Sequence, residues 1–381
     1  MTVVAGNVAA AFESVRAYLE TESQRDPEYA FQLAVYRGAE RVIDLWGGDG
    51  MSADSLMIPM SVSKNSIALV IGLLFDRGEI DLDAPVASYW PEFAAEGKGG
   101  VLVRELLSHQ AGLPEAHPRI TDAELVDPVA AAARLAAQLP WWRPGAMFGY
   151  HALTIGLLGA ELVRRATGRT FAEFFETEIR GPRGFDFHVG STPELEQRVL
   201  ETLPMIRPEA PAAPPFTLTA GQLGREVFAG VATQRTPEEQ IEWSRAQRRL
   251  GNPAGFATVS ARGVAALFAE SVVGVSGPAL LTPDTVARLA QPQVTGVDAA
   301  IGIPRSYGIV FQKPTPNLAF GSHRAFGHDG AGGGLGFHDP RTGVSFGYLV
   351  RRTPYPGGAD ARAIEAAQRI HALVEATGDA R

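Results

Sequence analysis

The sequence contains no cysteine, which excludes disulfide bonds, thiol nucleophiles and cysteine-based metal sites. Lysine is also scarce: of the 34 lysine and arginine residues, only Lys64, Lys98 and Lys313 are lysine. Arginine stays protonated in proteins, so a lysine retained here is a candidate for chemistry that needs an amine able to lose its proton. For Lys98 and Lys313 we expect an ordinary surface position instead.

Long hydrophobic runs are absent as well. The longest, from Ile67 to Phe75, has nine residues, whereas a membrane-spanning helix needs about 20. The N-terminal region has no basic segment ahead of its apolar residues, and Glu13 interrupts them, so we expect no secretory signal peptide. These features predict a cytoplasmic protein.

The charge balance excludes two classes of partner. A net charge of −8 at pH 7, with acidic residues spread along the chain, argues against nucleic acid and anionic membranes. The 381 residues are 45% hydrophobic, enough to build a large core. We expect a globular protein that acts on a small molecule.

Strand-like and helical patterns divide the chain into three parts. Strands are predicted near both ends, and helices dominate the middle. The predicted strands are 31–36, 41–46, 307–312, 324–328, 334–338 and 344–351. The predicted helices are 8–22, 62–77, 103–108, 128–138, 152–167, 171–179, 236–249, 260–271 and 360–377.

Two N-terminal strands alone form a marginal sheet, so we expect them to pair with the C-terminal strands. The sequence therefore predicts an α+β fold, with one antiparallel sheet flanked by helices on both faces and a helical region inserted between its halves. Residues 1–58 and 301–381 would form the sheet domain, and 59–300 the helical region. The proline-rich stretch 203–215 is either a surface connection or a lid.

The first chemical motif is the sequence Ser61-Val-Ser-Lys64 ahead of a buried helix. A serine in the first helical turn and a lysine three residues later lie on the same face. The helix dipole favours an alkoxide at that end, and a buried amine can accept the serine proton. The alternative is a helix-capping serine followed by an exposed lysine.

The second motif is Tyr150, which ends a loop containing Trp141 and Trp142 and precedes a predicted helix. A phenol beside an ammonium group can ionise and act as a general base or proton shuttle. A packed, hydrogen-bonded tyrosine is the alternative for a lone residue.

The third motif is the glycine-rich segment that follows His328 and Asp329 and includes Gly330 and Ala331. Glycines at a strand end let a substrate approach backbone N–H donors, as an oxyanion hole requires. The spacing does not fit a dinucleotide-binding fingerprint. A plain hairpin is the alternative.

Together the three motifs resemble the serine β-lactamase and penicillin-binding protein superfamily. Within it they fit the class C β-lactamase-like branch. The local sequences at 106–113, 150–159 and 327–330 are most similar to the family VIII carboxylesterases. The resemblance spans residues 30 to 350 and implies an antiparallel sheet with helices on both faces.

The resemblance also implies roles for residues. Ser61 would be the nucleophile, and Lys64 and Tyr150 would share the proton transfers. The backbone N–H groups of Ser61 and Ala331 would form the oxyanion hole. The substrate-binding residues would be His328, Gly330, Trp141, Trp142 and Ala152.

Two departures from the superfamily pattern favour esters as substrates. Ala152 stands where the β-lactamases of this branch have asparagine, and His328 stands where they have lysine. Histidine is only partly charged at neutral pH, so the anion-binding groups of a β-lactamase are missing. We therefore expect a serine carboxylesterase that acts on neutral esters through an acyl-enzyme, without a metal or cofactor.

Three alternatives stay open at this point. The same fold serves β-lactamases and D-amino-acid peptidases, and it serves acyltransferases that deliver the acyl group to another alcohol or amine. A non-catalytic binding module is a further alternative, although intact Ser61, Lys64 and Tyr150 argue against it.

Overall fold

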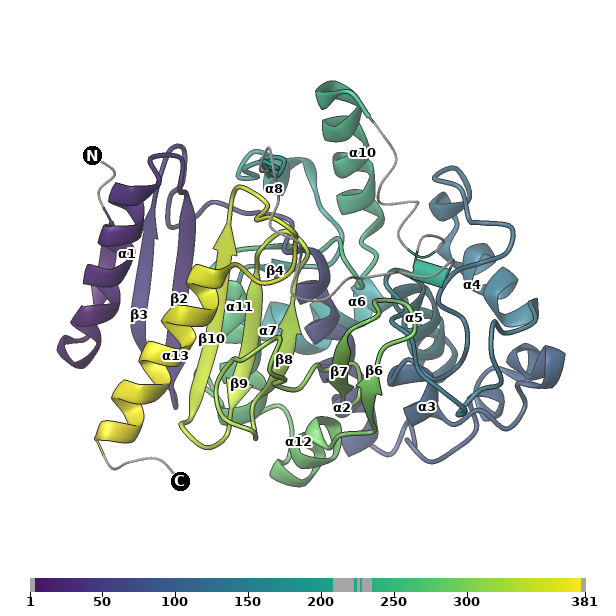
Figure 1. Cartoon of the computed structure of the whole chain (residues 1–381). Coiled ribbons are helices and arrows are strands. Elements are labelled where there is room, and N and C mark those ends of the chain that lie inside the picture. The colour runs from purple at the N-terminus through teal and green to yellow at the C-terminus, as the bar shows by residue number, and fades with distance from the viewer. Residues whose placement is uncertain (1–3, 208–222, 225–226, 228–234, 378–381) are drawn as a thin grey trace.

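A six-stranded antiparallel sheet forms one side of the protein, and Figure 1 shows its strands side by side. The computed structural model describes residues 4–207, 223–224, 227 and 235–377. The strand order is β1-β3-β2-β10-β9-β8. The strands are β1 (Ala5–Val8), β2 (Phe31–Arg37), β3 (Glu40–Gly47), β8 (Phe326–Asp329), β9 (Leu335–Asp339) and β10 (Val344–Val350).

The N-terminal and C-terminal strands meet at the centre of the sheet. β2 pairs antiparallel with β10 over its whole length, from Phe31 opposite Val350 to Arg37 opposite Val344. Pairing between strands from the two ends of the chain confirms the predicted α+β fold. The domain boundaries given above stay a prediction.

Strand residues alternate between two hydrophobic clusters, one on each face of the sheet. Phe31, Leu33 and Val35 lie in the cluster covered by α1 (Glu13–Arg25) and α13 (Ala361–Ala376). Ala34 lies in the larger cluster on the opposite face, where α11 (Ala261–Phe268) packs. Figure 1 shows α1 and α13 side by side in front of the sheet and α11 behind it.

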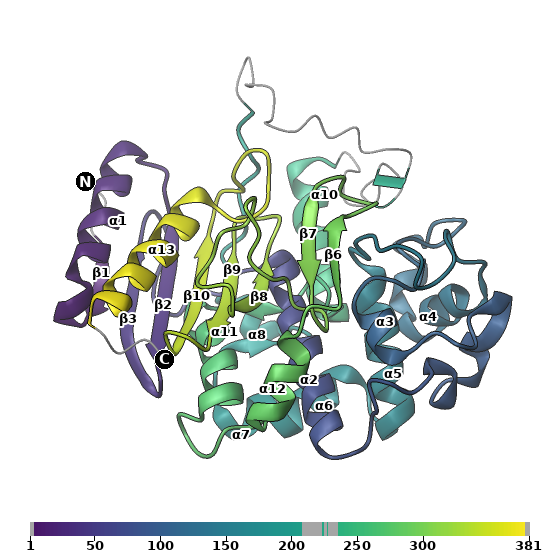
Figure 2. The same ribbon diagram turned by 60° about the horizontal axis from the view of Figure 1, so that its bottom comes forward.

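The helical region lies beyond β8 (Figure 2). Its central helix, α2 (Asn65–Asp76), is buried from Asn65 to Leu74, which explains the unbroken apolar sequence there. Helices α5 (Thr154–Thr167), α6 (Phe171–Phe175) and α12 (Pro283–Ala290) pack against it. The other helices in this part of the chain are α3 (Val103–Leu107), α4 (Pro128–Ala137), α7 (Gly181–Arg183), α8 (Pro193–Glu196) and α10 (Pro237–Leu250).

Several predicted elements differ from the structure. The helix predicted from residue 8 begins at Glu13, because residues 5–8 form β1 and pair with the edge of β3. The strand predicted at 307–312 is instead β7 (Pro304–Tyr307), which pairs with β6 (Val294–Val297). Strands β1 and β6 and helix α12 were not predicted.

The expected surface position of two lysines was wrong. Both side chains are buried, and backbone carbonyl oxygens accept their ammonium protons. Lys98 Nζ donates to Ala95 O and Gln138 O, and Lys313 Nζ donates to Arg324 O. Their positive charge is therefore satisfied inside the fold.

The proline-rich stretch is described only up to residue 207. Leu203 is hydrogen-bonded to the backbone just after β10, where its N–H donates to Arg351 O. Residues 208–215 lie outside the described residues. In the described part of the chain, no helix combines the length and hydrophobicity needed to cross a membrane.

Candidate active site

Ser61 lies in a short 3-10 helix, Met60–Lys64, that leads directly into α2. Met60, just before it, has a φ of 51°, in the left-handed region that non-glycine residues rarely occupy. Such backbone strain concentrates at functional sites. The turn leaves the Ser61 side chain partly exposed at the start of a buried helix.

Lys64 is fully buried and its amine contacts three oxygen atoms. Nζ lies 2.7 Å from Ala152 O, 2.6 Å from Ala254 O and 3.1 Å from Ser61 Oγ. Carbonyl oxygens only accept hydrogen bonds, so two positions of the nitrogen must carry N–H groups directed at them. In the neutral amine, the lone pair is then directed at the hydroxyl of Ser61.

Burial sets the charge state of this amine. Desolvation lowers the pKa of Lys64 well below its usual value, and the carboxylate of Asp329 opposes the shift only in part. A lysine with a lowered pKa can act as a base near neutral pH. The arrangement can therefore draw the proton from the Ser61 hydroxyl.

Tyr150 contacts the other side of the same hydroxyl. Its phenol oxygen lies 2.7 Å from Ser61 Oγ, and Lys64 Nζ lies 4.9 Å from the centre of its ring. Burial raises the pKa of Tyr150 above its usual value of 10.0. The phenol is thus protonated and donates to Ser61 Oγ, in contrast to the ionised phenol considered from sequence.

Asp298 fixes the backbone of Tyr150, a role that sequence analysis missed. Its Oδ1 accepts the N–H groups of Tyr150, Ala300 and Ile301 at 2.9–3.0 Å. Its Oδ2 accepts the hydroxyl of Tyr307 at 3.2 Å, and the Tyr307 ring stacks on that of Tyr150. Asp298 is 148 positions away from Tyr150, and no local pattern links them.

Two further histidines support the tyrosine loop. His151 Nδ1 donates to Gly149 O and its Nε2 accepts the N–H of Leu113. His109 Nδ1 accepts the N–H of His151, and its ring centre lies 5.2 Å from that of Tyr150. Segment 106–113, noted above for its family resemblance, therefore contacts the tyrosine motif directly.

The third motif lies at the end of β8, against the Ser61 turn. A Cβ atom on Gly330 would come within 2.2 Å of Pro59 O, so only glycine allows this approach. His328 is buried, and its Nδ1 donates to Asp329 O at 2.6 Å. Burial lowers the pKa of His328 to about 3, so His328 is neutral and provides no cation.

The two predicted oxyanion-hole donors are the N–H of Ser61 itself and the N–H of Ala331, which follows Gly330. The N–H of Ser61 belongs to the first turn of its helix, where backbone donors have no helical partner. Ala331 is exposed, and no backbone hydrogen bond found outside helices and strands in the described part of the chain uses its N–H. Both donors are available to an oxyanion.

The remaining predicted site residues occupy different positions. Ala152 contributes its carbonyl to Lys64. Trp142 packs its ring against His151 and donates to Gln110 O, behind the tyrosine loop. Trp141 is 36% exposed, and its ring contacts His117. Their contact with substrate stays a prediction.

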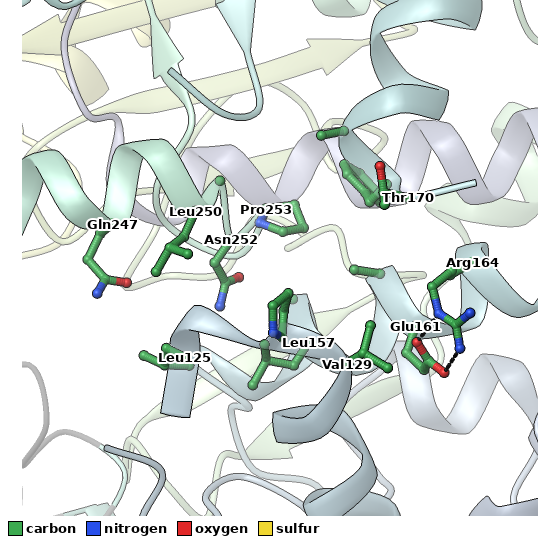
Figure 3. Close-up of a pocket in the computed structure, with 16 residues that line it drawn as sticks. Leu125, Val129, Leu157, Glu161, Arg164, Thr170, Gln247, Leu250, Asn252 and Pro253 are labelled. Carbon is green, nitrogen blue, oxygen red and sulfur yellow. Dashed lines mark hydrogen bonds and ion pairs between the residues drawn. The ribbon is translucent and has the colours of Figure 1, made fainter. Parts of the chain in front are cut away.

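A separate cavity of about 250 Å³ opens between α4, α5, α6 and α10 (Figure 3). Apolar side chains form most of its wall, including Leu125, Val129 and Leu157. Asn252 connects it to the site, because its Oδ1 accepts the N–H of Ala254, the residue whose carbonyl accepts from Lys64. The cavity wall does not include the three residues around the Ser61 hydroxyl.

Comparison with known proteins agrees with this geometry. The family described as Beta-lactamase matches residues 19–369. The chain belongs to the Beta-lactamase family. It is 32% identical over 343 residues to the esterase/beta-lactamase LipL of Mycobacterium tuberculosis, a match that covers 85% of this chain and 77% of LipL.

Two solved structures are similar over nearly the whole chain. EstA from Arthrobacter nitroguajacolicus Rue61a superposes with a TM-score of 0.88 at 36% identity, covering 97% of this chain and 98% of EstA. A family VIII carboxylesterase superposes with a TM-score of 0.85 at 30% identity, covering 96% and 99% of the two chains. The resemblance to the serine β-lactamase and penicillin-binding protein superfamily is thereby confirmed.

Proposed function

We propose that this member of the Beta-lactamase family is a serine carboxylesterase, which hydrolyses small-molecule esters through an acyl-enzyme at Ser61. One observation carries the proposal: the Ser61 hydroxyl lies between a buried amine at 3.1 Å and a protonated phenol at 2.7 Å. The esterase names of LipL and of the family VIII carboxylesterase support the ester as substrate class.

In the acylation step, the Ser61 proton passes to the Lys64 amine while Oγ bonds to the ester carbonyl carbon. The N–H groups of Ser61 and Ala331 stabilise the oxyanion of the tetrahedral intermediate. The bond to the alcohol then breaks. The leaving oxygen takes the phenol proton of Tyr150, which the Lys64 ammonium replaces.

Deacylation repeats these proton transfers with water in place of the serine. A water molecule attacks the acyl carbon and gives its proton to the neutral Lys64 amine. The bond from the acyl carbon to Ser61 Oγ then breaks, and the serine recovers its proton. The acid product leaves, and the site returns to its starting state.

The missing cation in the third motif favours esters over β-lactams. Lactam and D-peptide substrates of this superfamily carry a carboxylate, and His328 in its neutral form does not attract one. We infer that p-nitrophenyl butyrate is hydrolysed at least about 100-fold faster in kcat/KM than a chromogenic cephalosporin.

The cytoplasmic location predicted from sequence is part of this proposal, and cell fractionation with an antibody to the protein tests it.

Substrate assays on wild type and Ser61→Ala test the function. The wild-type enzyme is expected to release p-nitrophenol with an initial burst, and the variant is expected to retain no activity above background. Equal or faster turnover of the cephalosporin would assign a β-lactamase instead. Transfer of the acyl group to added methanol, in preference to water, would assign an acyltransferase.

A further inference from the structure

The cavity between α4, α5, α6 and α10 has the size and the wall of a small-molecule site (Figure 3). Its volume is about 250 Å³, and an apolar cavity of about 150 Å³ is already enough to bind benzene. Leu157, Phe171 and Pro253 belong to its wall, and Val129 at its edge is 41% exposed, so the cavity is reached from solvent. Such a wall favours a ligand that is itself mainly apolar.

The two charged residues of the wall are paired with each other. The carboxylate of Glu161 accepts hydrogen bonds from Nε and Nη2 of Arg164, both at 2.7 Å, and another from Nε of Arg165. Figure 3 shows the pair between Glu161 and Arg164 as dashed lines. A charged ligand would lose its hydration without gaining a free partner here, so the cavity favours a neutral molecule.

The amide of Gln247 is the polar group that remains available in this wall. Its residue is 3% exposed, and within the described ranges no hydrogen bond uses its side chain. Its amide atoms are not among the unpaired polar atoms that are sealed from solvent, and Gln247 lines the cavity. Figure 3 shows it on the same side of α10 as Leu250. An alcohol hydroxyl, which both donates and accepts, is a matching partner for this amide.

Asn252 joins the cavity wall to both carbonyl groups that hold Lys64. Its Oδ1 accepts the N–H of Ala254 at 2.9 Å, and its Nδ2 donates to Leu153 O at 3.4 Å. Lys64 Nζ donates to the carbonyl oxygens of Ala254 and of Ala152, the residue before Leu153. One side chain of the wall therefore fixes both backbone segments around the catalytic amine.

We propose that the cavity is a second binding site, for a neutral and mainly apolar alcohol whose hydroxyl pairs with Gln247, and that its occupation speeds the reaction at Ser61. The bound molecule supplies packing contacts to Asn252 on the side that faces the cavity. It thereby holds the two carbonyls that direct the Lys64 lone pair at Ser61. The regulatory part rests on the proposed function, because an alcohol is the product that an esterase releases.

Binding is tested on Ser61→Ala, which cannot form an acyl-enzyme, by titration calorimetry with 1-heptanol. We expect a dissociation constant of about 1 mM or tighter. Heptanoate and heptylammonium have the same chain length but carry a charge. They are expected to bind at least about 10-fold more weakly, because the wall offers no free partner to either charge.

Variants show whether the alcohol occupies this cavity. Ala160→Phe on α5 and Ala172→Phe on α6 each place a ring in it, and both are expected to weaken binding of 1-heptanol at least about 10-fold. Ala372→Phe, on an exposed position of α13, is the matched control and is expected to bind normally. Gln247→Leu is expected to lose about 2- to 10-fold, the contribution of one hydrogen bond. Thermal melting shows whether each variant is folded.

The effect on the reaction is measured as the rate at which an activated phosphonate labels Ser61. This step needs the pair of Ser61 and Lys64, and transfer of an acyl group to the alcohol cannot affect it. Saturating 1-heptanol is expected to raise the labelling rate of the wild type about 5-fold, the lower end of typical coupling between two sites. In Ala160→Phe the alcohol is expected to have no such effect.

Three outcomes would overturn the inference. They are a chain that does not bind 1-heptanol, binding that both phenylalanine variants of the cavity leave unchanged, or binding that does not raise the labelling rate. The proposed function fails separately, if Ser61→Ala retains the wild-type esterase activity, and that result leaves the binding measurement intact.

Discussion

In the proposed mechanism, the charge state of one side chain, Lys64, decides whether the Ser61 hydroxyl can lose its proton. Two carbonyl oxygens hold two of its N–H groups, and its third position faces Ser61 Oγ. Burial makes the neutral form accessible, whereas arginine at the same place would stay charged at every pH of interest. Of the three lysines in the sequence, only Lys64 is therefore proposed to do the chemistry that arginine could not.

Replacing Lys64 by arginine is expected to reduce kcat about 1000-fold or more, because the substituted group keeps its positive charge but cannot accept a proton. Steady-state hydrolysis of p-nitrophenyl butyrate measures the effect. Lys98→Arg is the matched control, since that lysine is also buried and also donates to two backbone carbonyls. A Lys64→Arg enzyme within about 10-fold of the wild type would contradict the assignment of Lys64 as the base.

At the scale of elements, the site depends on how closely the end of β8 approaches the Ser61 turn. Gly330 allows the contact with Pro59 because it has no Cβ atom. Gly332, two residues on, is different: a Cβ there would be 3.2 Å from the flexible Met60 side chain, which can move aside. The two glycines therefore offer a matched pair of substitutions.

Gly330→Ala is expected to lower kcat/KM about 100-fold, because β8 and the N–H of Ala331 must move away from Ser61 and a displacement of about 1 Å has that effect on catalysis. Gly332→Ala is expected to stay within about 5-fold of the wild type. Ester kinetics together with thermal melting would show whether the loss is catalytic. Equal activity of the two variants would argue against the oxyanion role of this segment.

Elements with strong local patterns could be predicted from the sequence, and those held by distant contacts could not. The unbroken apolar sequence of α2 reflects a helix that is buried along nearly its whole length. Residues of β2 and β10 alternate between the hydrophobic clusters on the two faces of the sheet. Strand β1 exists only because it pairs with β3, so its four residues have no pattern of their own.

The same distinction applies to the site. Ser61, Lys64 and Tyr150 could be found from short motifs, because a serine and a lysine one helical turn apart form a pattern that is visible in the local sequence. Asp298 holds the Tyr150 backbone from the β6–β7 hairpin, whose position follows from tertiary packing. Its neighbours in the sequence carry no comparable pattern.

At the scale of the whole molecule, buried neutral histidines couple stability to pH. Burial lowers the pKa of His151 and His338 to about 4 and that of His328 to about 3. His151 lies in the tyrosine loop, and the other two lie on the paired strands β9 and β8. Each takes up a proton near its ordinary pKa of about 6.5 only when the protein unfolds.

The free energy of unfolding is therefore expected to fall as the pH drops from about 6.5 towards about 4, by about 1.4 kcal/mol per pH unit for each such histidine. The sign follows because the unfolded state binds more protons across this range. Urea unfolding at a series of pH values measures the slope. His338→Gln, on β9 where the ring contacts Ser345, is expected to reduce the slope by about one proton, and an unchanged slope would contradict this account.

The identity of the nucleophile is tested most directly by covalent labelling with an activated phosphonate ester, followed by peptide mapping by mass spectrometry. We predict one phosphonate per chain, on Ser61, with complete loss of esterase activity and with a labelling rate that rises with pH as Lys64 loses its proton. Ser61→Ala is expected to take up no label. A label on another residue, or esterase activity that survives Ser61→Ala, would contradict the account.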